Sequence, residues 1–75
     1  MKVDLPQLKQ LITRRTDEIE ARVAGSGYLA RTVIGVATFL YDNEGETDLL
    51  TAKQQATFER FLAPMLAQPP GKLGE

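Results

Sequence analysis

The sequence predicts an all-α domain, a small three-helix bundle with short turns. Apolar residues recur with helical spacing in three segments, and turns rich in glycine or acidic residues separate these segments. The one segment that could form a strand has no second strand to pair with. We expect a single domain over residues 1–68, with helices at about 5–24, 28–42 and 52–67, and a flexible tail over residues 69–75.

The first predicted helix, residues 5–24, has clear signals at both ends. Asp4 is a good N-cap, because its carboxylate can accept hydrogen bonds from the backbone N–H groups of the first turn. Pro6 lies in that turn, where a missing N–H costs nothing. One stripe of the helix collects the apolar side chains of Leu5, Leu8, Leu11, Ile12, Ile19 and Val23. Gly25 is a left-handed C-cap by prediction, so the helix should end just before it.

The second segment, residues 28–42, is ambiguous because many of its residues are good strand formers. As a strand it would have two apolar faces and no partner in the chain. As a helix it places eight apolar residues on one arc of about 160°. These residues are Leu29, Ala30, Val33, Ile34, Val36, Ala37, Leu40 and Tyr41. The period therefore predicts a helix.

The third predicted helix, residues 52–67, follows Thr51, which could form a capping box with Gln54. Apolar residues then repeat at helical spacing: Phe58, Phe61, Leu62, Met65 and Leu66. Pro64 interrupts this stretch but points away from the apolar stripe, so we expect a kink and a further helical turn. We expect a core that contains Leu29, Val33, Leu40, Phe58, Phe61 and Leu62.

The composition argues against ordinary catalysis. The chain has no Cys and no His, so the commonest general base, the best nucleophile and the usual zinc ligands are all missing. Its single serine, Ser26, lies between two glycines, and this position predicts that it is a turn residue or a helix cap. We expect a protein that is not an enzyme and has no cofactor. The lack of Cys, of a visible signal peptide and of a long apolar run predicts a cytoplasmic protein without a membrane partner.

Four carboxylates within seven residues, Asp42 to Asp48, make the acidic turn a candidate calcium site. The EF-hand spacing fails, however. With Asp42 in the first position, the sixth is Thr47 instead of Gly and the twelfth is Lys53 instead of Glu. We therefore predict a solvated turn with no specific metal site, and the sequence leaves open whether the turn binds a cation.

A row on one side of the second helix is the main candidate for binding. Its members lie within about 60° of one another: Tyr28, Thr32, Gly35 and Phe39. Aromatic rings beside small residues suit docking of another protein or of a second copy. In a central helix the same two rings would instead belong to the core. The sequence favours a small non-catalytic protein–protein interaction or self-association module, which we adopt as the working hypothesis.

The alternative is a small nucleic-acid-associated regulator that uses the basic residues of the first helix. These residues are Lys9, Arg14, Arg15 and Arg22. A phosphate-binding surface needs concentrated, unpaired cations. Acidic residues are interleaved with these four, and the net charge of the chain is −1. Nucleic acid is thus the less favoured partner.

Overall fold

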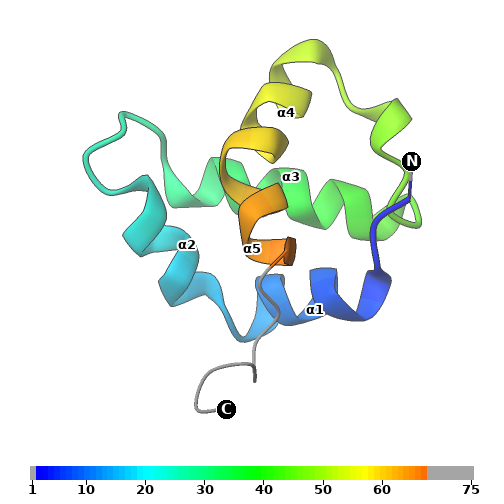
Figure 1. Cartoon of the computed structure of the whole chain (residues 1–75), viewed down its shortest axis with the longest axis horizontal. Coiled ribbons are helices and arrows are strands. Elements are labelled where there is room, and N and C mark those ends of the chain that lie inside the picture. The colour runs from blue at the N-terminus through cyan, green and yellow to red at the C-terminus, as the bar shows by residue number, and fades with distance from the viewer. Residues whose placement is uncertain (1, 68–75) are drawn as a thin grey trace.

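The computed structural model describes residues 2–67 and confirms the all-α class (Figure 1). The elements in chain order are α1 (Leu5–Thr13), α2 (Thr16–Val23), α3 (Ala30–Asp42), the 3-10 helix η1 (Thr47–Leu49), α4 (Ala52–Thr57), the π-helical turn η2 (Phe58–Leu62) and α5 (Ala63–Ala67). The last three follow one another without a gap and form one continuous helix. The flexible tail predicted for residues 69–75 lies outside the described residues.

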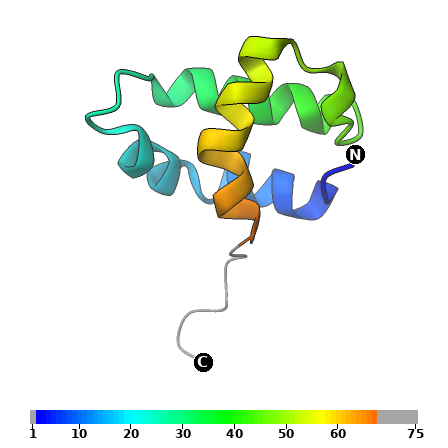
Figure 2. The same ribbon diagram turned by 45° about the horizontal axis from the view of Figure 1, so that its top comes forward.

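Helix α3 is the central element of the bundle. It contacts α1, α2, α4 and η2, and the helix formed by α4, η2 and α5 crosses over it (Figure 2). The buried apolar side chains come from all of these elements: Leu8, Leu11, Ile19, Val23, Val33, Val36, Ala37, Leu40, Phe58, Phe61, Leu62 and Met65. Five of the six predicted core residues are among them.

The prediction that Leu29, the sixth residue, belongs to the core is wrong, because its side chain is 54% exposed. Leu29 is the N-cap of α3 and has an extended backbone (φ −101°, ψ 140°). The angular argument that placed it on the apolar arc holds only inside a helix. The second helix was predicted to begin at residue 28, whereas α3 begins at Ala30.

The single helix predicted over residues 5–24 is also wrong, because the chain breaks at Arg15 (φ −116°, ψ 23°) and forms α1 and α2. A continuous helix would have carried Arg15 and Thr16 in its apolar stripe, between Ile12 and Ile19. With the break, α1 and α2 take different directions, and each still contacts α3 (Figure 1). The buried guanidinium of Arg15 obtains polar partners in Glu18 and the Met65 carbonyl.

Both predicted helix caps are present. The Asp4 carboxylate accepts a hydrogen bond from the Gln7 amide at 3.1 Å. The Thr51 hydroxyl accepts from the Gln54 amide at 3.1 Å, and the Gln54 side chain accepts from the Thr51 amide at 2.9 Å, which completes the capping box. These bonds satisfy N–H groups that have no partner within the helix.

The helix continues through Pro64 as predicted, and its irregularity is the π-helical turn directly before the proline. The Ala63 amide donates to the Phe58 carbonyl, five residues earlier. Proline has no N–H, and its ring crowds the carbonyl of the residue four positions before it, here Arg60. A wider turn relieves that crowding and keeps Phe61 and Met65 in the core.

The N-terminal segment is attached to the turn after α3 at Gly45. The Val3 amide donates to the Gly45 carbonyl at 2.8 Å, and the Gly45 amide donates to the Leu40 carbonyl at 2.6 Å. The backbone of Gly45 is left-handed (φ +78°), and a Cβ there would clash with the Val3 carbonyl oxygen and lie 2.9 Å from the Val3 nitrogen. Only glycine fits this position without a shift of the backbone.

We expect Gly45→Ala to lower the free energy of unfolding by more than about 1 kcal/mol, because it combines left-handed strain with a backbone clash. Gly25→Ala is the matched control, since Gly25 has a similar φ of +77° but nothing within 4 Å of the added Cβ. Urea unfolding of both variants measures the difference. Equal losses of stability in the two variants would show that the clash between the added Cβ and the Val3 backbone does not destabilise the fold.

Candidate functional site

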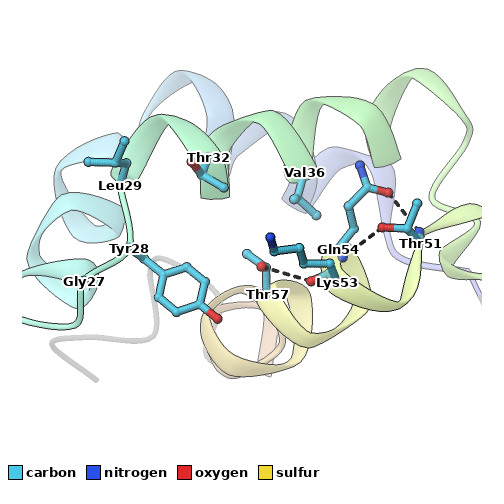
Figure 3. A pocket seen from close by; sticks show the side chains of 9 residues that line it. All are labelled: Gly27, Tyr28, Leu29, Thr32, Val36, Thr51, Lys53, Gln54 and Thr57. Atoms are coloured by element: carbon cyan, nitrogen blue, oxygen red, sulfur yellow. Dashed lines mark hydrogen bonds between the residues drawn. The ribbon is translucent and has the colours of Figure 1, made fainter.

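A groove of about 460 Å³ lies between the first half of α3 and α4 (Figure 3). The residues that line it are Gly27, Tyr28, Leu29, Thr32, Val36, Thr51, Lys53, Gln54 and Thr57. Val36 and Thr57 are 5% and 4% exposed and form the floor. Leu29, Thr32 and Lys53 are exposed and form the rim. The groove is open to solvent along its length and is mainly apolar.

Tyr28 closes one end of the groove and is held in place by several contacts. Its ring meets the Phe61 ring edge to face, with 4.9 Å between centroids, and the Arg60 guanidinium lies 5.4 Å from the centroid of each ring. The Ser26 hydroxyl accepts from the Tyr28 amide at 3.1 Å and donates to the Val23 carbonyl at 2.6 Å. Ser26 is therefore a turn residue, one of the two roles predicted for it.

Lys53 gives the groove its charge. In Figure 3 its side chain lies along the groove, and its Nζ is directed toward the end that Tyr28 closes. The lining contains no Asp or Glu. Within the part of the chain that the structure describes, Lys53 and Arg60 have no carboxylate partner. The Tyr28 end of the groove is thus a positively charged region beside an apolar floor.

The four residues of the row predicted on the second helix do not share one surface in the structure. Tyr28 and Thr32 line the groove, whereas Gly35 and Phe39 do not. Gly35 is exposed, with nothing within 4 Å of the position of a Cβ, and Phe39 is half-buried. The row separates because Tyr28 precedes α3, so that its position is set by the turn after α2 and by Phe61.

Sequence reasoning missed the side of the groove that α4 supplies, above all Lys53 and Thr57. The helical pattern of residues 52–67 gives the apolar stripe but not the part of α3 that the helix crosses. The burial of Thr57 could have been suspected from the sequence, because Thr57 directly precedes Phe58, the first residue of the apolar repeat. The Thr57 hydroxyl donates to the Lys53 carbonyl at 3.2 Å, which satisfies this buried polar group within its own helix.

The four basic residues of the nucleic-acid alternative have different environments. Lys9, Arg14 and Arg22 are exposed. Arg15 is 5% exposed, and its Nε and Nη2 donate to the two Glu18 carboxylate oxygens at 3.0 and 2.8 Å. Its Nη1 donates to the Met65 carbonyl at 3.3 Å. Arg15 therefore links α2 to α5, and the three exposed cations remain the predicted phosphate contacts.

Residues of the acidic turn make contacts within the chain. Glu46 lies 4.0 Å from the Lys2 ammonium and forms an isolated β-bridge with the same residue. Thr47 is buried in the 3-10 helix η1. Among residues 2–67, no three carboxylates are close enough together to hold a metal ion.

Within the same range, no helix combines the length and the apolar character needed to cross a membrane. Comparisons with protein-family models, curated proteins and solved structures find no match for this chain. A function is therefore inferred from the groove's own residues.

We expect Arg15→Met to lower the free energy of unfolding by about 1–3 kcal/mol, because the Met65 carbonyl and Glu18 lose their donor while the volume of the side chain is largely kept. The adjacent Arg14→Met is the control, since Arg14 is exposed and its loss should change stability by less than about 0.5 kcal/mol. Thermal and urea unfolding measure both. Two equally stable variants would contradict a structural role for Arg15.

The ion pair between Arg15 and Glu18 predicts that the stability of the fold depends on pH. The hydrogen bonds from Arg15 hold the pKa of Glu18 below its ordinary value, and the charges of Arg15 and Arg22 act in the same direction, while burial opposes them. The resulting stability is complete above the ordinary glutamate pKa of about 4.3 and is lost as the pH falls through the lowered pKa. The stability difference between wild type and Glu18→Gln should therefore shrink on acidification. A difference that does not change between neutral and strongly acidic pH would contradict this pairing.

Proposed function

We propose that this chain is a non-catalytic protein-interaction module that binds its partner in the groove between α3 and α4. The observation that carries the proposal is an open, mainly apolar groove with an exposed leucine, Leu29, on its rim. Apolar surface gains about 25 cal/mol for each Å² removed from water. An exposed apolar patch rimmed by polar groups is typical of an interaction site.

Several side chains of the groove are held in place by contacts within the chain, which supports the same proposal. Tyr28 is fixed by Phe61 and Arg60, and Thr51 and Gln54 are fixed by the capping box. A partner that binds here would not have to immobilise these side chains, so the side-chain part of the entropic cost of association is reduced. Tyrosine and arginine are also the residue types that dominate binding energy at protein interfaces.

The polar groups of the groove favour binding over catalysis. They are hydroxyls, one amide and one ammonium group. Thr57 donates its proton to a backbone carbonyl, and Thr51 and Gln54 are used to cap α4. The lining contains no His, Asp or Glu, which are the usual general bases that activate a hydroxyl nucleophile.

Photo-crosslinking tests the proposal in cells that naturally express the chain. We expect a photoreactive side chain at position 32 to give a discrete adduct with a partner, and the same side chain at position 38 to give none. Thr32 and Thr38 are both exposed threonines on α3, but of the two Thr32 alone lines the groove, because six residues of helix place their side chains about 120° apart. Helix content measured by circular dichroism checks that both variants fold.

Leu29→Asp should then remove the adduct at position 32, because it places a charge on the apolar rim. An adduct at both positions, or none at position 32, would contradict a binding role for the groove. An adduct with twice the mass of the chain would show that the partner is a second copy.

A further inference from the structure

The groove's charge and its helical walls together define the class of partner that it fits. We infer that the occupant is an amphipathic α-helix of another protein, with an acidic side chain beside its apolar stripe. This inference rests on the proposed function, because it assigns an occupant to the same groove.

The walls of the groove favour a helix over an extended peptide. Both walls are helices, α3 and α4, and beyond the first turn of α3 their backbone N–H groups bond within the helix or to the capping box of α4. An extended peptide obtains its affinity from an open strand edge, and the groove offers none. The isolated bridge between Lys2 and Glu46 does not line it. A bound segment must satisfy its own N–H and C=O groups, which an α-helix does.

The need for an acidic side chain follows from positive features that converge at the Tyr28 end. The Lys53 side chain is directed toward this end (Figure 3), and the Arg60 guanidinium, which does not itself line the groove, lies over the Tyr28 ring. Helix α3 begins at the same end, and its N-cap, Leu29, provides no side-chain hydrogen bond. The first turn of a helix carries partial positive charge, which adds to that of the two side chains.

A second copy of the chain does not supply such a helix. Across residues 2–67, the large hydrophobic side chains that are exposed are Leu29 and Leu49. The apolar stripes of α1, α2 and α3 are buried in the core. A copy that docked by one of these helices would have to unfold part of its own core, so we assign the occupant to a different protein.

Selection from a displayed library of helical peptides tests the inference. Each peptide has about 16 residues, or roughly 24 Å of helix, with an apolar stripe of varied composition and flanking positions varied among Glu, Gln and Lys. We expect the wild-type chain to enrich Glu over Lys at one flanking position by about two- to fivefold, the upper part of the range for an exposed ion pair. Amide shifts of the labelled chain should place the bound peptides at Leu29, Thr32 and Thr57.

Lys53→Gln should abolish the preference for Glu, while Lys9→Gln, which neutralises an exposed lysine on α1, should keep it. Binders that reach the groove without a preference for Glu would overturn the inference and leave the proposed function intact. Failure to select any binder, or binding elsewhere on the chain, would overturn both. A concentration-dependent dimer that shifts the same amides would overturn the inference by giving the groove to a second copy.

Discussion

The packing of α1, α2, α4 and η2 against α3 is the constraint on which the rest of this structure depends. The chain has no cysteine, so no disulfide can replace apolar burial in a domain near the lower size limit for a stable core. Val33, Ala37 and Leu40 of α3 are fully buried, which requires cover from several directions. Helices α1 and α2 provide part of it by changing direction at Arg15. The helix over residues 52–67 provides the rest by crossing α3 (Figure 2).

The crossing also creates the groove. Two helices that cross are close where they touch and separate on either side of that point. Val36 and Thr57 fill the space near the contact, and Tyr28 fills the far end, which leaves a hollow between them. The floor therefore consists of buried residues, whereas the rim residues Leu29 and Thr32 contribute little to the core. Changes at the rim can alter binding without loss of stability, and changes at the floor cannot.

Local patterns in the sequence predicted the helical segments, the caps at Asp4 and Thr51, and most of the core. Each of these depends on neighbours within about one or two helical turns. The break at Arg15 could not be predicted in the same way, because it depends on the Met65 carbonyl, fifty residues away. Two of the nine residues that line the groove, Tyr28 and Thr32, were also predicted as binding residues. Lys53 was not, because the crossing that brings α4 beside α3 is a property of tertiary packing.

The positive end of the groove constrains its partner by exclusion as much as by attraction. An occupant that covered Lys53 with purely apolar surface would remove its charge from water without replacing its solvation, which is costly. A basic segment would add like-charge repulsion in a region where the apolar floor lowers the local dielectric constant. A carboxylate at this end avoids both costs, and the interaction strengthens as the apolar stripe beside it excludes water. The groove thus discriminates among apolar helices of similar shape by charge, because binding the wrong one leaves the Lys53 ammonium group uncompensated.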